Sequence, residues 1–193
     1  MKKIKNTSKL SKTNQIVITA LCIALCAVLP FAFHSIPMGG AIYCPMHIPV
    51  LICGIVCNWQ AAMLCGIIGP VISCLTTGMP NSATLPTMMI ELAVYGLVAG
   101  LMMKHVSTKS SIADVYISLV TAMISGRIVG ALAKALIFAK GAQTIEALAT
   151  AYFVTCLPGI VIHLILVPAV YFALQKSRLI AKRYISEAVP TNE

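Results

Sequence analysis

The chain has 193 residues, of which 59% are hydrophobic and only 10% are charged. A soluble domain carries about 25% charged residues, so this composition excludes a soluble fold and indicates an integral membrane protein. The formal net charge of +9 would suggest a nucleic-acid partner in a soluble protein. Here the basic residues gather at the two chain ends, beside apolar segments, where they act as determinants of membrane topology. We therefore expect a lipid bilayer as the surroundings and no nucleic acid as a partner.

The apolar segments predict an all-α fold with six transmembrane helices, in one membrane domain that covers residues 1–193. A spanning helix needs about 20 residues, so a chain of this length leaves room only for short loops. The first segment follows a basic stretch, as in a signal peptide, but it is too long and lacks a cleavage site before Pro30. We interpret it as an uncleaved span. The predicted spans lie at about residues 15–33, 46–57, 61–79, 86–103, 112–139 and 147–175.

Residues 46–79 could form one helix or two. A single helix would be about 51 Å long at 1.5 Å per residue, well beyond the hydrocarbon core of about 30 Å. The only polar interruption is Asn58-Trp59-Gln60, and tryptophan is typical of the membrane interface. We therefore predict a tight helical hairpin at these three residues.

The distribution of lysine and arginine favours six spans over five. With six spans, the N-terminus, the loop 104–109 and the C-terminal tail share one side and contain eleven of the basic residues. The other side contains only Lys140, while Arg127 and Lys134 lie within the fifth segment. Because basic loops remain in the cytoplasm, we predict that both termini are cytoplasmic. The loops 34–45, 80–85 and 140–146 would then face outside.

Charged side chains within the spans are functional candidates, because they are costly in hydrocarbon. Glu91 lies about five residues into the fourth segment and Arg127 about two thirds of the way along the fifth, so both are predicted in the outer half of the bilayer. One interpretation is a structural ion pair. The other is that Arg127, together with Lys134, faces an outward pocket and binds a carboxylate or phosphate. The two overlap, because a buried Glu91 can hold Arg127 in place for a third group.

Polar residues near the predicted outer loops could complete such a pocket, since small-molecule sites combine an apolar wall with a few convergent polar groups. His34 and Tyr43 lie in the first outer loop, and His47 begins the second helix. Each could equally be an ordinary interfacial residue. Asn81 lies in the second outer loop, where it could contact a ligand or only stabilise a turn.

Other polar and small residues are interpreted as structural. Asp114 opens the fifth helix, where a carboxylate complements the helix dipole, and His163 is predicted to hydrogen-bond a neighbouring helix. The pair Gly126 and Gly130 has the small-xxx-small spacing that allows close helix packing. Ala20 and Ala24 have the same spacing on the first helix, where a docking face for another membrane subunit is an equal alternative to internal packing.

The sequence contains no motif for catalysis, a cofactor or a metal site. The eight cysteines form no CxxC pair or zinc-like Cys/His set, so we expect them to pack as small apolar residues. No GxxxxGK[ST], HExxH or GxSxG motif occurs. We therefore expect no enzyme, no cofactor and no metal, and any ATP-driven work must come from another chain.

These features together resemble the substrate-binding S components of energy-coupling factor (ECF) vitamin transporters, over about residues 13–177. The resemblance rests on the pair Ala20 and Ala24, on the entry of the second helix at 45–54, and on Gly126-Arg127-Ile128-Val129 in the fifth helix. The turn Asn58-Trp59-Gln60 departs from the Gly-Pro-rich turn of that family, which leaves the end of the second helix in doubt.

The resemblance implies a subunit of the bacterial cytoplasmic membrane that binds a vitamin or vitamin precursor from outside. The cavity would be capped by the loop between the first two helices. A transmembrane coupling subunit would dock at Ala20 and Ala24, two ATP-binding subunits would supply the work, and the subunit would topple to release its cargo. From their own positions and polarity, the candidate binding residues of that cavity are His47, Tyr43, Asn81, Glu91, Arg127 and Lys134.

The substrate is less well determined than the class. An arginine in the outer half favours an anionic vitamin, which suits pantothenate, while pyridoxine-like and hydroxymethylpyrimidine-like ligands stay open. Two other classes of protein also fit the residues alone. One is a small membrane scaffold or assembly protein, in which Arg127 and Glu91 only pair; the other is a stand-alone secondary carrier.

Overall fold

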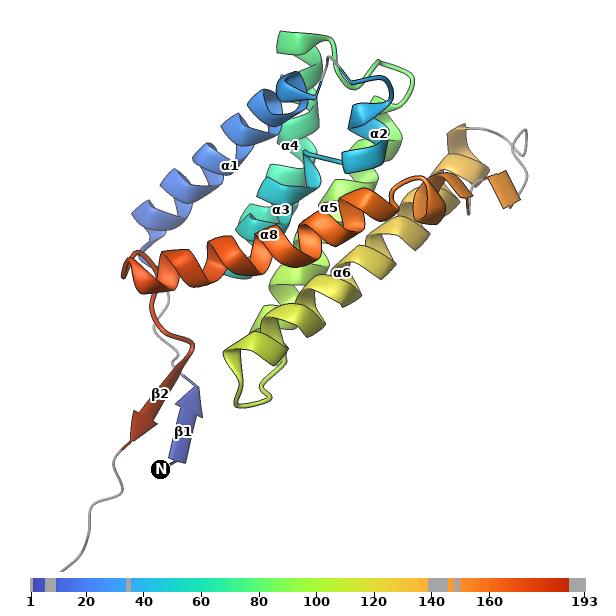
Figure 1. Cartoon of the computed structure of the whole chain (residues 1–193). Helices are drawn as coiled ribbons and strands as arrows, with labels where there is room; N and C mark the ends of the chain where they lie inside the picture. Colours follow the sequence, from blue (N-terminus) through green and yellow to red (C-terminus); the bar gives the residue numbers. More distant parts are fainter. Residues whose placement is uncertain (1, 6–9, 34–35, 139–145, 148–149, 188–193) are drawn as a thin grey trace, which may run out of the picture.

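The structure, a computed structural model, describes residues 2–5, 10–33, 36–138, 146–147 and 150–187. His34 and Lys140, which the sequence predicts in outer loops, lie outside these ranges. The elements in chain order are β1 (Lys2–Lys5), α1 (Lys12–Ala32), α2 (Gly39–Tyr43), α3 (His47–Val56), α4 (Trp59–Thr77), α5 (Leu85–His105), α6 (Ser111–Ala133), the π-helical turns η1 (Lys134–Phe138) and η2 (Thr150–Val154), α8 (Leu157–Lys176) and β2 (Tyr184–Glu187) (Figure 1).

Six helical segments of the described chain are long and apolar enough to cross a membrane. Three of them are the single helices α1, α4 and α5. The second segment joins α2 and α3, the fifth extends α6 into η1, and the sixth joins η2 and α8. The predicted six-helix organisation is confirmed, while the side of the membrane on which each end lies stays a prediction.

The break between α3 and α4 falls at the predicted hairpin. Asn58 caps α4, because its Oδ1 accepts a hydrogen bond from the Ala61 backbone N–H at 2.7 Å, and asparagine is among the preferred N-cap residues. Its Nδ2 also donates to Oε1 of Gln15 in α1 at 2.7 Å. Asn58 therefore begins α4 after the break and also ties this turn to α1.

Glycines bring α4 and α5 into backbone contact. A Cβ at Gly66 would lie 2.4 Å from the Leu92 carbonyl oxygen, and a Cβ at Gly96 would lie 2.3 Å from that of Ala62. No side chain fits at such distances, so the two helices pack as closely as small residues allow. This contact fixes the position of α5, which also packs against α3 and α6.

On its α6 side, α5 presents two polar side chains to a second pair of glycines. A Cβ at Gly126 would lie 3.0 Å from the ring of Tyr95, and a Cβ at Gly130 would lie 3.0 Å from the side chain of Glu91. The spacing of Gly126 and Gly130 therefore serves internal packing, as predicted. Because glycine has no side chain, these two positions leave room for Tyr95 and Glu91 at the contact between α5 and α6.

The cysteines are free thiols, and most of them fill the contacts between helices. Cys22 and Cys26 of α1, Cys53 of α3 and Cys65 of α4 are buried members of one apolar core. This agrees with their interpretation as small packing residues.

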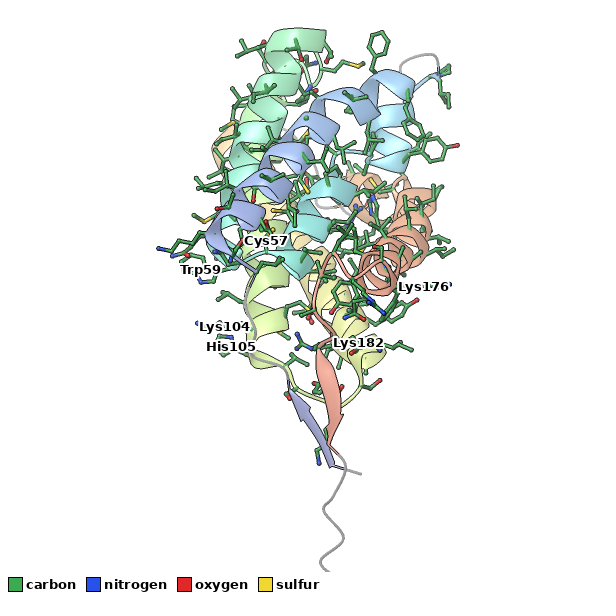
Figure 2. All side chains as sticks on the ribbon, turned by 90° about the vertical axis from the view of Figure 1, so that its left-hand side faces the viewer. Cys57, Trp59, Lys104, His105, Lys176 and Lys182 are labelled. Atoms are coloured by element: carbon green, nitrogen blue, oxygen red, sulfur yellow. The ribbon has the colours of Figure 1, made fainter. Side chains whose placement is uncertain are left out.

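The sequence predicts only helices, but the chain ends form a short two-stranded ribbon. β1 and β2 pair antiparallel, with Lys2 opposite Glu187 and Lys5 opposite Tyr184. The ribbon lies at the end of the bundle away from α2 (Figure 1), and Lys104 and Lys182 lie toward the same end (Figure 2). Of the basic residues on which the predicted topology depends, those of β1 together with Lys104 and Lys182 therefore share one end of the molecule.

Asp114 does more than complement a helix dipole. Its carboxylate is fully buried, accepts hydrogen bonds from the N–H and the hydroxyl of Thr108 at 2.8 and 2.6 Å, and forms an ion pair with Arg183. The Tyr184 hydroxyl donates to it at 2.5 Å, and Nη2 of Arg183 donates to the Val106 carbonyl at 2.7 Å. This network fastens the C-terminal segment to the loop between α5 and α6.

Candidate functional site

A cavity of about 590 Å³ lies at the end of the bundle that carries α2. Its wall is formed by the end of α1, by α2 and the start of α3, by residues 78–84, by the first turns of α5, by α6 and by residues 151–156. Small-molecule sites have volumes of about 300–1,000 Å³. Residues of two predicted outer loops, 34–45 and 80–85, therefore meet around a space of the size of a small-molecule site, whereas the third, 140–146, lies outside the described residues except for residue 146.

Five of the six predicted binding residues line this cavity, and they come from different elements: His47, Asn81, Glu91, Arg127 and Lys134. The sixth, Tyr43, is not among the described lining residues. It ends α2, and its ring packs against Phe33, with 5.2 Å between ring centroids. Tyr43 thus supports the wall from behind, while a contact between ligand and the other five stays a prediction.

Arg127 is the most deeply placed charge of the cavity, with only 2% of its surface exposed. Its Nη1 donates to the Tyr152 carbonyl oxygen in η2. Its Nε and Nη2 have no hydrogen-bond partner in the described protein. The guanidinium therefore presents two N–H donors that the surrounding chain does not satisfy, which is rare for buried polar groups.

Glu91 pairs with His47 and not with Arg127. The Oε1 of Glu91 lies 3.4 Å from Nε2 of His47, and within the described ranges no ion pair joins Glu91 to Arg127. The first interpretation of Arg127, a structural ion pair with Glu91, requires a contact that is absent from the described residues. The positions of Glu91 and Arg127 along their segments predict that both lie in the outer half of the bilayer. They do not predict which neighbouring side chain each one contacts.

Two buried residues that the sequence analysis left out of the site hold His47 in position. The Tyr95 ring lies edge-on to the His47 ring at 4.8 Å, and the His163 ring stacks on it at 5.7 Å. Tyr95 follows Glu91 by four residues and so shares its helix face, a spacing that could have identified it. Across the described residues, no group of three or more His, Cys, Asp or Glu side chains is arranged to hold a metal ion.

The cavity lining also contains a second cation, Lys134, and a polar turn at Asn81. Lys134 begins η1, and its Nζ lies 6.0 Å from the centroid of the Tyr152 ring. Asn81 uses its Oδ1 to accept hydrogen bonds from the N–H and the hydroxyl of Thr84, at 3.0 and 2.9 Å. Asn81 therefore stabilises the turn before α5, and its Nδ2 is the group that it can offer to a ligand.

The remaining wall is apolar and contains few aromatic rings. Methionine is polarizable and has a flexible side chain, so a wall of this kind adapts to the shape of a ligand. Phe33 and Tyr152 are the described phenyl-type rings of the lining. The methionines of the wall are Met38, Met46, Met79 and Met88.

The sequence matches the family model described as ECF transporter, substrate-specific component, over residues 14–171. The chain belongs to this family. The match confirms the resemblance seen in the sequence, and a search of curated proteins finds no match. Together with the six candidate spans, the family makes the chain a multi-pass membrane transport protein and not an enzyme.

Family membership decides between the three functional classes. A substrate-specific component of an ECF transporter is neither a scaffold nor a self-sufficient carrier. The matched range contains every described lining residue of the cavity, whereas both strands of the terminal ribbon lie outside it. The cavity thus belongs to the part of the chain that defines the family.

The first helix of this ECF component has a buried face and an exposed face. Cys22 and Cys26 are buried against the bundle, while Ala20 and Ala24 are exposed about half a turn away. Small residues on an exposed apolar face allow another helix to approach closely. The predicted docking residues are therefore accessible, and docking itself stays a proposal.

Proposed function

We propose that the cavity binds an anionic, water-soluble vitamin or vitamin precursor from outside the cell, and that Arg127 is the residue that holds its anionic group. The observation that carries this proposal is the pair of unpartnered N–H donors on a guanidinium that is 2% exposed and lines the cavity. Leaving a buried donor unsatisfied costs about 1–3 kcal/mol, and more for a charged group. A ligand that supplies the missing acceptor removes this cost.

A carboxylate or phosphate suits these donors best. The guanidinium is planar and presents parallel N–H groups that match the two oxygens of such an anion. Lys134 adds a second positive charge at the same cavity. The Glu91–His47 pair, which also lines the cavity, can take hydrogen-bond donors of the ligand, such as hydroxyl or amide groups.

Among the usual vitamins, this combination favours pantothenate. Pantothenate carries one carboxylate together with hydroxyl and amide groups on an aliphatic chain. A wall of methionine and proline with few rings suits such a chain better than a flat aromatic ligand, which is usually stacked between aromatic side chains. Pyridoxine-like and hydroxymethylpyrimidine-like ligands are the alternatives that the test must include.

The orientation of the cavity follows from charge. Lys104, Lys182 and the terminal ribbon lie at the end of the bundle opposite to α2, and basic segments remain in the cytoplasm. The cavity would then face outside, in the bacterial cytoplasmic membrane that the family implies. Release on the other side would need the partners of an ECF transporter: a transmembrane coupling subunit docked at Ala20 and Ala24, and two ATP-binding subunits.

A thermal-shift screen of the purified chain against a panel of water-soluble vitamins tests this proposal. A specific ligand at 100 times its Kd stabilises the protein by about 2.7 kcal/mol, which raises the melting temperature by several degrees. We expect pantothenate to stabilise the protein and neutral vitamins to have no effect. Stabilisation by neutral vitamins alone would refute the proposal that the ligand is anionic. An unchanged melting temperature with every vitamin of the panel would refute binding in this cavity.

A further inference from the structure

Two cysteines from distant parts of the chain meet at the edge of the cavity. Cys44 follows α2 and Cys156 precedes α8; they are only 6% and 8% exposed. The Cys44 thiol donates to the carbonyl oxygen of Ala41 at 3.2 Å. The Cys156 sulfur lies 3.1 Å from the same oxygen and 3.2 Å from the carbonyl oxygen of Ala151, so its single proton can be donated to either. The two sulfur atoms are therefore at most 6.3 Å apart.

This pair differs from the other cysteines of the chain. All eight cysteines lie in the described ranges, and of these only Cys44 and Cys156 line the cavity. The other six do not line it, and Cys22, Cys26, Cys53 and Cys65 belong to the apolar core. A solute that enters the cavity can thus reach Cys44 and Cys156, whereas the core thiols are enclosed by helices.

The backbone around the pair is already held in place. The Cys44 carbonyl oxygen lies 3.2 Å from Nε2 of His163 in α8. A Cβ on Gly159 of α8 would lie 2.7 Å from the Ile42 carbonyl oxygen, so the end of α2 rests directly on α8. A disulfide needs an S–S distance of about 2.04 Å, so the two sulfur atoms must approach each other from a separation of at most 6.3 Å.

We propose that Cys44 and Cys156 form a redox-active dithiol site, which a low-molecular-weight disulfide oxidises to a disulfide bond between α2 and α8. In the first step the sulfur of one cysteine attacks the small disulfide, forms a mixed disulfide and releases one small thiol. In the second step the other cysteine attacks the mixed disulfide and releases the second small thiol. Two protein thiols are oxidised and one small disulfide is reduced.

The bond would join the two parts of the wall that enclose the proposed anion site. Residues 36–41 and 44–47 form the α2 side of the cavity, and Cys156 lies four residues after Tyr152, whose carbonyl oxygen accepts a hydrogen bond from Arg127. Fixing α2 on α8 would restrict the movement of this wall and slow the exchange of ligand. The access of an external oxidant rests on the proposed outward orientation, whereas the geometry of the thiol pair does not.

Oxidation of the purified full-length chain by glutathione disulfide tests the site. We expect the intact mass to fall by two hydrogen atoms and peptide mapping to find Cys44 joined to Cys156. The variants Cys44→Ser and Cys156→Ser should not lose the two hydrogens, while Cys74→Ser, which removes a half-buried thiol of α4 outside the cavity, should behave as the wild type. A mixed disulfide that never resolves, or a bond between other cysteines, would overturn the proposal.

Two further measurements separate this proposal from the proposed function and do not depend on the serine variants. Phenylarsine oxide bridges neighbouring dithiols, so it should block disulfide formation in the wild type; failure to react would count against the pair. Amide hydrogen exchange of residues 39–44 should slow by about tenfold on oxidation, and unchanged exchange would refute the fixing of α2. If the disulfide forms but pantothenate does not bind, the dithiol site is supported and the proposed function is refuted. If pantothenate binds but the disulfide does not form, only the dithiol site is refuted.

Discussion

Replacing Arg127 by methionine should remove ligand binding while leaving the fold intact. Methionine has a similar length and an apolar surface, so it fills the same space without the guanidinium. Truncating one member of a desolvated charge pair costs about 2–5 kcal/mol of binding, which corresponds to a loss of affinity of about 30- to 4,000-fold. The ligand-free protein should be affected much less, because the substitution removes two unpartnered donors together with one hydrogen bond to Tyr152.

Isothermal titration calorimetry measures the loss, with the best anionic ligand of the thermal-shift panel as the titrant. Arg127→Lys should recover only part of the affinity, since an ammonium group lacks the planar fork. Arg178→Met is the matched control, because Arg178 is exposed after α8, outside the cavity, and its loss changes the net charge by the same amount. The control should bind as the wild type does.

The competing interpretation makes an opposite prediction. If Arg127 serves only to neutralise Glu91, Arg127→Met should lower the melting temperature, and Glu91→Gln added to it should restore much of the loss by removing the orphan charge. The ligand affinity of that double variant would then be close to the wild-type value. An affinity within threefold of the wild type would refute the role of Arg127 in binding, and with it the preference for pantothenate.

Three other predictions follow from the ends of the bundle and from α1. Cysteines placed at residues 8 and 186 should resist an impermeant maleimide added to intact cells, because both termini are predicted to be cytoplasmic; labelling from outside would refute the topology. Ala20→Leu and Ala24→Leu should keep ligand binding but reduce co-purification with the coupling subunit, since a bulky side chain prevents close helix approach. Asp114→Asn should lower the free energy of unfolding by about 2–3 kcal/mol, because its buried carboxylate binds Arg183; an unchanged denaturation midpoint would contradict the role of that network.

The sequence predicted the parts of the fold that depend on composition and local signals. Six spans followed from apolar segments of bilayer length, and the break before α4 followed from one polar stretch, where Asn58 is now seen to cap the helix. The terminal ribbon could not be predicted this way. β1 has the sequence KKIK, and lysine is depleted in strands, so only the pairing with β2 identifies it as a strand.

Within the site, the sequence identified polar residues but not their partners. The cost of charge in a membrane span points to Glu91 and Arg127, and the place of His47 beside the first predicted outer loop points to that residue. All three line the cavity. Cys44 and Cys156 are 112 positions apart, and they lie near the same Ala41 carbonyl oxygen because the end of α2 rests on α8. Neither helix periodicity nor a spacing motif contains that information.

The pairing of Glu91 decides how the charges of the cavity are distributed. The chain has only five acidic residues against fourteen basic ones. In the cavity, Oε1 of Glu91 lies 3.4 Å from Nε2 of His47. Asp114, in the first turn of α6, forms its ion pair with Arg183. Arg127 and Lys134 thus face the cavity without a described carboxylate partner. A buried charge needs a counter-charge, and an anionic ligand is the group that can supply it in a cavity of this size.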